Sequence, residues 1–321
     1  MIEQEPFETA RWSVVIPTWN GRHLLEEALN ALDRQSLRNF EIIVVDDASD
    51  DDTVEWIREN RPRDVVIELS ARRGLAVALN RGIEFASASY IALLNNDAVP
   101  DAGWLMALDN AFRAEPAVSF LASRIRLYDD PSRLHAAGDT YSRSGLPGNR
   151  GAWDADGGDY LMACHVFGAC AAAAGYRREL FDDVGLFDED LVMYCEDVDL
   201  DWRAQLAGHR CLYVPDAIVR HRLSATAGGV LASYLVARNR PLVAVMNMPG
   251  FVWRYSWWRV IGAQLKLGIQ ALRGMSGQAA RATLAGQFAA IPHLHKAWRK
   301  RVSRQKARKA SDAYIDSILK R

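Results

Sequence analysis

Two groups of oxygen-bearing side chains stand out because each follows or lies beside an apolar segment. The first is Asn95-Asn96-Asp97, which ends the run IALLNND at 91–97. The second is the acidic cluster Glu196-Asp197-Val198-Asp199, about a hundred residues later. Such oxygens can present a metal-bound diphosphate, and a carboxylate from elsewhere in the chain can take a proton from an attacking group. Together they indicate group transfer from an activated donor.

The composition is that of a globular protein with an uneven charge distribution. Of the 321 residues, 50% are hydrophobic and 25% are charged, which excludes global disorder. This length allows one large domain or a domain with an appendage. Residues 1–250 carry 24 Lys and Arg against 38 Asp and Glu, whereas residues 251–321 carry 15 against 2. The chain therefore consists of an acidic body and a basic tail.

Targeting and redox signals are weak. The opening MIEQEPFETARW is acidic and shows no secretory leader, so we expect folding in the cytoplasm. The sequence contains no stretch of about 18 uncharged apolar residues, so no membrane-spanning helix is predicted. The cysteines form neither a CxxC pair nor a metal-ligand spacing with histidine, and we expect reduced thiols packed as small apolar groups. They are Cys164, Cys170, Cys195 and Cys211.

The first hundred residues alternate apolar runs with segments of helical periodicity. The expected strands are 12–16, 41–45, 65–69 and 90–94, and the expected helices are 23–32, 53–59 and 74–86. Strands that are apolar on both faces and separated by helices predict an α/β fold with a mainly parallel, doubly wound sheet. Ligands of such sheets bind beyond the carboxyl ends of the strands. The polar clusters 18–20, 46–52 and 95–97 all lie at that end, so we expect one shared site.

The second half is less regular. Residues 128–160 are rich in Gly, Asp and Ser without periodicity, which predicts a long flexible loop. The other expected elements are a buried strand at 161–175, helices at 177–184 and 197–207, and a short strand at 211–214 that Pro215 stops. His221 is expected in an extended segment after it.

The tail combines aromatic and basic residues. A helix is expected at 231–245, packed back on the body, followed by the segment FVWRYSWWR at 251–259 and an amphipathic helix at 260–272. Residues 296–309 hold eight basic residues and no acidic one. Trp and Tyr favour the water–lipid boundary, and Lys or Arg beside them attract anionic head groups. We therefore expect a catalytic domain at 1–228 and a helical extension at 229–321 that lies on a membrane surface.

Six segments in a fixed order carry a resemblance to a known family. They are VVIPTWNG at 14–21, IIVVDDASDDDT at 42–53, ARRGLAVALNRGIEFA at 71–86, LLNNDAVP at 93–100, GLFDEDLVMYCEDVDLDWRAQLAG at 185–208 and VPDAIVRH at 214–221. Together they cover roughly residues 11–225 and resemble the inverting glycosyltransferases of family 2. The resemblance implies the nucleotide-sugar-binding fold called GT-A, and it is closest to the rhamnosyltransferase-like branch.

The resemblance also implies roles for individual residues. Asp197, the second residue of the Glu-Asp pair, corresponds to the general base. The expected donor-binding residues are Pro17, Thr18, Asn20, Asp47, Arg73, Asn96 and Asp97. Gly168 and Glu196 are expected on the acceptor side. A Mg²⁺ or Mn²⁺ ion is expected at Asp97 and His221, although Asn95 replaces the first aspartate of the family's Asp-x-Asp motif.

The implied reaction moves a sugar from a UDP- or dTDP-sugar, with dTDP-rhamnose as one candidate, to a hydroxyl of a glycan or lipid-linked saccharide. The expected setting is cell-envelope polysaccharide synthesis at the inner face of the membrane, because a lipid-linked acceptor lies there. For the tail, an oligomer contact with tryptophans buried between subunits is the main alternative. Nucleic-acid binding is not favoured, since no nucleic-acid-binding module is recognised.

Each feature also has a structural explanation when it is taken alone. The acidic run 46–52 could cap a helix, Arg73 could be a surface charge, the Glu196–Asp201 segment could be an acidic first helical turn, and His221 could be structural. Two rival functions remain. The first is a nucleotidyltransferase, but such enzymes usually have a Gly-rich basic loop after the first strand, and residues 18–22 do not form such a loop. A non-catalytic nucleotide-sugar binder would differ in showing no turnover.

Overall fold

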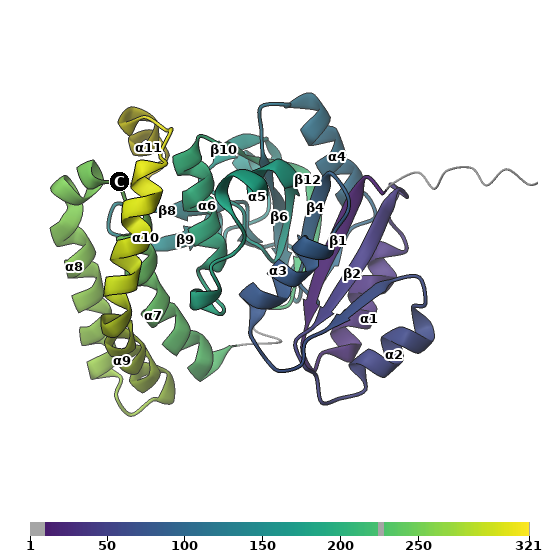
Figure 1. Cartoon of the computed structure of the whole chain (residues 1–321), viewed down its shortest axis with the longest axis horizontal. Helices are drawn as coiled ribbons and strands as arrows, with labels where there is room; N and C mark the ends of the chain where they lie inside the picture. Colours follow the sequence, from purple (N-terminus) through teal and green to yellow (C-terminus); the bar gives the residue numbers. More distant parts are fainter. Residues whose placement is uncertain (1–9, 224–227, 321) are drawn as a thin grey trace, which may run out of the picture.

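The computed structural model describes residues 10–223 and 228–320 of the chain. A central sheet carries helices on both faces, and the C-terminal helices form a further layer at one side of the molecule (Figure 1). The absence of a leader was expected from the opening residues, of which 1–9 lie outside the described part.

Eight strands form the main path of the sheet. In spatial order they are β10 (Cys164–Val166), β12 (Cys211–His221), β6 (Phe120–Leu127), β11 (Ala173–Arg177), β4 (Tyr90–Leu94), β1 (Trp12–Thr18), β2 (Phe40–Asp46) and β3 (Val65–Glu68). All except β10 and β11 run in the same direction. The predicted mainly parallel α/β sheet is therefore confirmed, and β11 is the strand that interrupts it.

The two faces of the sheet explain the apolar runs. In β1, Trp12, Val14 and Ile16 pack on one face, whereas Val15 packs on the other. The first face is covered by α1 (Arg22–Leu32), α2 (Thr53–Asn60) and α4 (Trp104–Ala114). The second is covered by α3 (Leu75–Phe85), α5 (Arg178–Val184) and α6 (Glu196–Ala207). Because both faces are buried, successive residues of β1 must all be apolar or small.

Three predictions in the second half need correction. The run 161–175 is not one strand, because β10 ends at Val166 and β11 begins at Ala173. β12 continues through Pro215 to His221, with a shift in its pairing register between Val214 and Ile218. Pro215 thus removes a donor from the ladder without ending the strand.

The segment 128–160, expected as a loop, contains three short strands. They are β7 (Leu134–Ala136), β8 (Asp139–Tyr141) and β9 (Pro147–Asn149). β7 pairs with β6, and β8 pairs with β9 in a separate two-stranded sheet. Each is only three residues long, too short for an alternating pattern to be recognised in the sequence.

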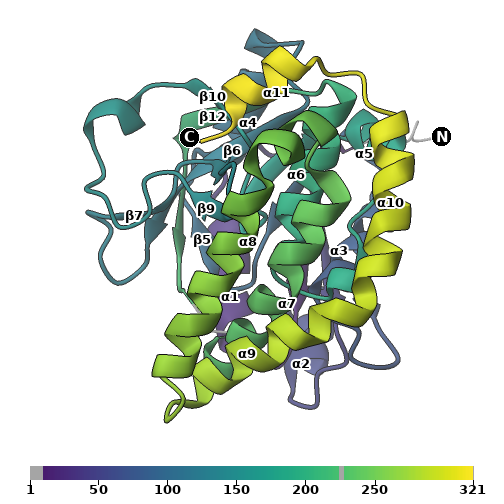
Figure 2. The ribbon, with the colours of Figure 1, turned by 90° about the vertical axis from the view of Figure 1, so that its left-hand side faces the viewer.

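Five helices form the C-terminal layer, which Figure 2 shows from its outer side. They are α7 (Gly229–Asn247), α8 (Gly250–Arg273), α9 (Gln278–Ala290), α10 (Leu294–Lys306) and α11 (Asp312–Ile318). Buried residues of α7, including Leu242 and Val243, share a core with Val198 and Trp202 of α6. The expected packing of the tail on the body is thus confirmed. No helix among the described residues combines the length and hydropathy needed to cross a bilayer.

Candidate active site

A cavity of about 680 Å³ lies beyond the carboxyl ends of β1, β2 and β4. Its wall contains both Asp97 and Asp197, although a hundred residues separate them. The expectation that the two polar groups share one site is therefore confirmed. Of the other residues expected from the sequence, the wall also contains Pro17, Thr18, Asp47, Arg73, Asn96, Glu196 and His221.

Hydrogen bonds between strand ends hold together the residues that were expected to bind the sugar donor. The amide nitrogen of Asn96 donates to Thr18 Oγ1 at 3.0 Å, which joins the ends of β1 and β4. The carboxylate of Asp47 accepts from the backbone N–H of Arg73 at 2.6 Å and of Gly74 at 2.8 Å. Asp47 therefore orders the loop before α3, and each of its oxygens retains a lone pair for a ligand.

Two expected residues do not line the cavity. Asn20 is exposed, and its side chain bonds to Asp50, which joins two loops at the rim. Gly168 lies behind the wall, where an added Cβ would be 1.8 Å from a carboxylate oxygen of Asp201. The small size of Gly168 thus accommodates Asp201, and its position offers no surface to an acceptor.

At the position where the sequence predicts a metal ion, β5 (Ala98–Pro100) pairs with the end of β12, and His221 lies opposite Ala98. His221 Nε2 is 3.0 Å from Asp97 Oδ1, and its Nδ1 is 3.1 Å from Nδ1 of His135. Burial, reinforced by His221, lowers the pKa of His135 to about 3. His135 comes from β7, inside the segment that the sequence suggested was a loop, so the sequence analysis missed it.

Asp97 Oδ1 and His221 Nε2 could supply two of the ligands of a divalent cation. Two ligands on one small ion, each at about 2.1 Å, lie about 3 Å apart, which matches the separation of Asp97 Oδ1 and His221 Nε2. Within residues 10–223 and 228–320, no group of three or more His, Cys, Asp or Glu side chains could hold an ion. Mg²⁺ is commonly bound by one or two protein ligands together with substrate phosphates. The residues present therefore suit an ion whose remaining ligands come from a diphosphate.

The wall also includes Glu196 and Asp197, with which α6 begins. Asp197 is partly accessible from the cavity, and its Oδ2 accepts from Ala171 N at 3.4 Å. Burial away from bulk water raises the pKa of Asp197. Glu196 is buried, and burial together with the charge of Asp197 raises its pKa to about 8. The pair therefore holds a proton more readily than two exposed carboxylates would.

Two further carboxyls lie close to this pair. Asp139, from β8, lines the cavity, and Asp201 lies one turn after Asp197 on α6. Both are buried, and desolvation is the main cause of their raised pKa values, with the charge of Asp197 adding to it. Neither Asp139 Oδ1 nor Asp201 Oδ2 has a hydrogen-bond partner among the described residues. The site is thus built around a buried group of carboxyls.

Asp199 belongs to the same acidic run but has a different role. It faces away from the cavity and contacts Arg203 at 2.9 Å and Asn247 at 2.8 Å, together with Arg304 of α10. Although burial alone would raise its pKa, Arg304 and Arg203 hold the pKa of Asp199 at about 2. Positions 197 and 199 lie on opposite sides of a helix, so only the packing of α6 separates a cavity carboxylate from a structural one.

The loop before α6 has an unusual backbone. Val192, Tyr194 and Cys195 all have φ between 64° and 66°, a region that costs a non-glycine residue about 1–3 kcal/mol. The buried amide of Asn239 on α7 compensates for this strain. Its Nδ2 donates to the carbonyls of Leu191, Met193 and Tyr194 at 2.9, 3.0 and 2.8 Å. We call residues 191–195 the catalytic loop.

The helical layer makes further contacts at the site. Arg238 of α7 donates to the carbonyl of Asp190 at 2.7 Å, and Lys300 of α10 pairs with Asp188 at 2.5 Å. Arg240 lines the cavity and has a buried Nε without a hydrogen-bond partner in the described part of the chain. α7, which belongs to the expected extension 229–321, therefore forms part of the cavity wall.

At the mouth of the cavity, Arg72 stacks on Trp19, with 3.3 Å between the guanidinium carbon and the ring centroid. The sequence analysis assigned no role to either residue, nor to His135, Asp139, Asn239 or Arg240. Arg72 is adjacent to the predicted Arg73 and could have been inferred from it. The others carry no local signal, because each lies in the site only through its position in the fold.

Comparison with known proteins identifies the family. Residues 13–185 match the family model described as Glycosyl transferase family 2. A poly-beta-1,6-N-acetyl-D-glucosamine synthase of Staphylococcus aureus is 25% identical over 222 residues, which cover 67% of this chain and 51% of that protein. The uncharacterized protein y4gI of Sinorhizobium fredii is 30% identical over 240 residues, covering 67% of this chain and 25% of the relative. The chain thus spans about half, or less, of the length of these curated relatives.

Two solved structures resemble the fold. The mannosyltransferase PcManGT from Pyrobaculum calidifontis, in complex with GDP-Man and Mn²⁺, has a TM-score of 0.54 and 22% identity, and covers 95% of this chain and 88% of its own. GalNAc-T7 with UDP, GalNAc and Mn²⁺ has a TM-score of 0.60 and 18% identity, over 75% of this chain and 48% of that one. At these identities the likeness concerns the fold, and it agrees with the expected GT-A architecture.

Removing the Asn239 amide tests the support of the catalytic loop. We expect Asn239→Ala to lower the free energy of unfolding by at least about 2 kcal/mol, because three carbonyls lose their donor. Hydrogen exchange at residues 192–198 should accelerate as well. The control is Asn60→Ala, whose exposed amide contacts a single carbonyl in its own helix. Equal effects of the two substitutions on unfolding and exchange would contradict the assignment.

The raised pKa of Glu196 predicts a pH dependence of stability. The folded protein keeps this proton up to about pH 8, whereas a carboxyl with the ordinary value of 4.5 releases it earlier. The folded state therefore binds more protons between these values, and stability falls as pH rises through the window. Glu196→Gln should flatten this slope by up to about 1.4 kcal/mol per pH unit. Denaturant titrations at several pH values measure it, and an unchanged slope relative to surface Glu84→Gln would disprove the prediction.

Proposed function

We propose that this chain, which belongs to glycosyl transferase family 2, transfers a sugar from a nucleoside-diphosphate donor to an acceptor hydroxyl with inversion of configuration. The observation that carries the proposal is the cavity whose lining includes Asp97, Arg73 and Asp197. A donor diphosphate and a nucleophile can meet only if their binding groups face a common space. The cavity has the size range of small-molecule sites.

Asp197 acts as the general base in this mechanism. Its carboxylate takes the proton of the acceptor hydroxyl while the hydroxyl oxygen forms a bond to the anomeric carbon. The bond from that carbon to the phosphate oxygen breaks, and the nucleoside diphosphate leaves with the electron pair. A pKa raised by burial brings Asp197 closer to the operating pH and strengthens it as a base.

In this proposal, the sugar donor is bound by residues at and beyond the carboxyl ends of β1, β2 and β4. Thr18 and Asp47 lie where the base and ribose are expected, and Asp47 can accept from a ring N–H of uracil or thymine. Arg73, which lines the same cavity, would form paired hydrogen bonds to the diphosphate. A Mg²⁺ or Mn²⁺ ion held by Asp97 and His221 would neutralise charge that grows on the diphosphate oxygens. Mn²⁺ in the two similar solved structures supports a divalent ion.

The specific substrates follow from resemblance. The rhamnosyltransferase-like segments favour a UDP- or dTDP-sugar such as dTDP-rhamnose. The relative that makes poly-beta-1,6-N-acetyl-D-glucosamine supports a glycan or lipid-linked acceptor in cell-envelope polysaccharide synthesis. Such an acceptor would place the protein at the inner face of the membrane, in contact through the C-terminal extension. The separation of a catalytic domain at 1–228 from an extension at 229–321 is part of this proposal.

A panel of nucleotide sugars tests the donor assignment. We expect a UDP- or dTDP-sugar to raise the melting temperature, because a ligand that binds only the folded state stabilises it. At a hundred times Kd the gain is about 2.7 kcal/mol. Chelation of divalent ions should weaken the shift, as should Asp97→Asn. No stabilisation by any nucleotide sugar, with Mn²⁺ present, would argue against the donor site.

Substitution of the base separates catalysis from binding. We expect Asp197→Asn to lower turnover by about 10²-fold or more, because an amide cannot accept the hydroxyl proton. The donor-induced melting shift should persist, since Asp197 takes no part in the hydrogen bonds that join Thr18 to Asn96 and Asp47 to the backbone of Arg73. Asp216→Asn, at an exposed position, provides the control. Equal turnover in the wild type and the Asp197 variant would refute the assigned base, whereas a non-catalytic binder would show no turnover in either.

A further inference from the structure

The C-terminal layer has an unusual charge distribution. Residues 217–311 contain 17 Lys and Arg and no Asp or Glu. Some of these cations, such as Lys300 and Arg304, pair with the acidic body on the inner side of the layer. The four cations of α8 have no salt-bridge partner among the described residues. They are Arg254, Arg259, Lys266 and Arg273.

The outer face of this layer is also apolar. Of the 21 exposed large hydrophobic side chains in the described residues, 13 lie between Tyr255 and Val302. Along α8, five of them recur at intervals of three or four residues and are 48–61% exposed. They are Trp258, Ile261, Leu265, Ile269 and Leu272. This spacing places them in one stripe along the helix, and we call it the α8 stripe.

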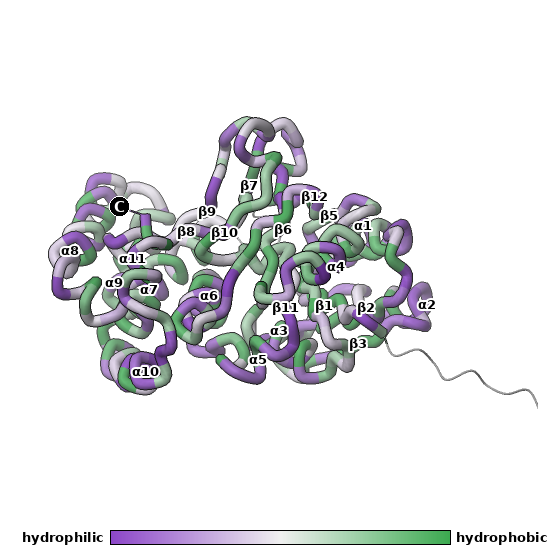
Figure 3. Tube along the Cα trace, turned by 90° about the horizontal axis from the view of Figure 1, so that it is seen from above, coloured by the Kyte–Doolittle hydropathy of each residue, from purple (hydrophilic) through white to green (hydrophobic). Residues whose placement is uncertain are grey.

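The hydropathy pattern agrees with this placement. Figure 3 shows hydrophobic and hydrophilic segments alternating along α8 and α10 at the edge of the molecule. On the inner side of α8, Val252 and Val260 are buried in the core shared with α6. The helix is therefore apolar on both its inner and its outer face, and only the inner face has a partner in the fold. Exposed apolar surface of this extent marks an interaction site.

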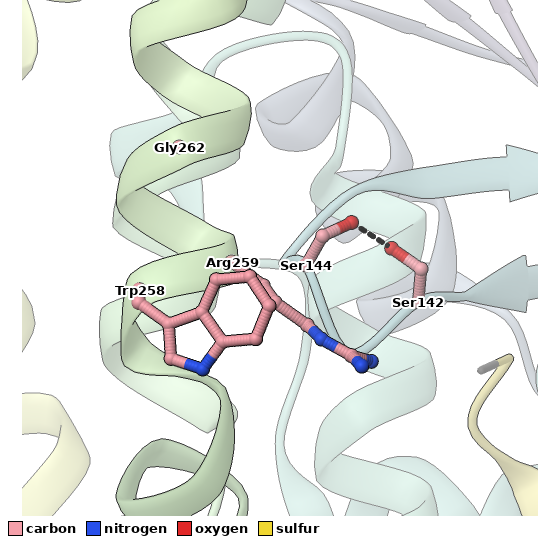
Figure 4. Close-up of a pocket in the computed structure, with 5 residues that line it drawn as sticks. All are labelled: Ser142, Ser144, Trp258, Arg259 and Gly262. Atoms are coloured by element: carbon pink, nitrogen blue, oxygen red, sulfur yellow. Dashed lines mark hydrogen bonds between the residues drawn. The ribbon is translucent and has the colours of Figure 1, made fainter.

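A small pocket opens beside the N-terminal end of the α8 stripe. It has a volume of about 330 Å³ and is lined by Ser142, Ser144, Trp258, Arg259 and Gly262. Figure 4 shows the Arg259 side chain extending from α8 toward the turn that carries the two serines. The serine hydroxyls are 2.7 Å apart. Gly262 leaves the pocket open, because a Cβ there would meet no atom within 4 Å.

We propose that this pocket binds the phosphate of an anionic phospholipid headgroup while the α8 stripe enters the acyl boundary. A guanidinium and the serine hydroxyl whose proton is not used in the Ser142–Ser144 hydrogen bond can donate to phosphate oxygens, and Trp258 is suited to the headgroup level. An amphipathic helix with basic flanks and a large apolar face lies in the interface plane. The inference rests on the membrane contact included in the proposed function, and it specifies the residues that make that contact.

Charge favours a lipid surface over a second copy of the chain. Two α8 stripes packed together would bring Arg259, Lys266 and their counterparts into one interface without any acidic residue on the helix. A nucleic acid would satisfy the cations but not the aliphatic stripe, since single strands are bound through aromatic stacking and charge. An anionic bilayer complements both features at once.

Sedimentation of the full chain with vesicles tests the proposal. Phosphatidylcholine vesicles containing phosphatidylglycerol should bind the protein, and pure phosphatidylcholine vesicles should bind it much less. We expect Arg254→Ala, which removes a charge of α8 outside the pocket, to weaken binding about fivefold or less. Arg259→Ala should weaken it at least tenfold, because it removes a headgroup contact as well. Leu265→Ser should also reduce binding, whereas Phe85→Ser, at an exposed apolar position on the body, should not.

Several outcomes would overturn the proposal. Equal losses in the Arg259 and Arg254 variants would eliminate the headgroup pocket. Release of the protein by millimolar inorganic phosphate would assign the pocket to free phosphate, and failure to bind anionic vesicles would eliminate the surface. Concentration-dependent dimerisation that Leu265→Ser abolishes would assign the α8 stripe to a second copy. Turnover with a water-soluble acceptor should be unchanged in these variants, so that a failed membrane proposal is distinguishable from a failed catalytic one.

Discussion

The contact between Asn239 and the catalytic loop is the interaction on which the site depends most. Three carbonyls of a backbone with left-handed residues converge on one buried amide, immediately before Glu196 and Asp197. Without a buried hydrogen-bond donor, these carbonyls would be unsatisfied, and the loop would relax to a backbone conformation of lower energy. The direction in which α6 begins, and therefore the position of Asp197, follows from this contact. A helix from the C-terminal layer thus supports the backbone that leads into Glu196 and Asp197.

Burial and ion pairing give the carboxyls near the cavity different pKa values, even within one acidic run of the sequence. Asp139, Glu196, Asp197 and Asp201 lie on the cavity side with few compensating cations, so burial raises their pKa values. Asp199, on the opposite side of α6, is surrounded by Arg203 and Arg304 and remains ionised. The same residue type is therefore a buried carboxyl with a raised pKa on one side of a helix and an ionised anchor on the other. Arg304, one of the two arginines beside Asp199, also attaches α10 to the body.

The helical layer therefore has two distinct faces. Its inner face supplies Asn239, which binds the catalytic loop, Arg240, which lines the cavity, and the ion pair of Lys300 with Asp188. Its outer face is basic and apolar, and we have inferred that it meets a lipid surface. Contact of the outer face with a membrane would place the cavity wall formed by α7 close to a lipid-linked acceptor. Binding energy at the surface and geometry at the active site would then be carried by the same group of helices.

The sequence by itself determined the elements of residues 12–94, the residues Asp97 and Asp197, and the contrast between body and tail. These features depend on neighbours two to four positions away, on motif order or on composition, which the chain displays directly. Only the tertiary structure decided that His135, Asp139, Asn239 and Arg240 belong to the site, that Asn20 and Gly168 do not line it, and that Asp199 is structural. Those outcomes depend on which strands and helices become neighbours. Contacts such as that between Asn239 and Tyr194 join residues 45 positions apart, and no local pattern specifies them.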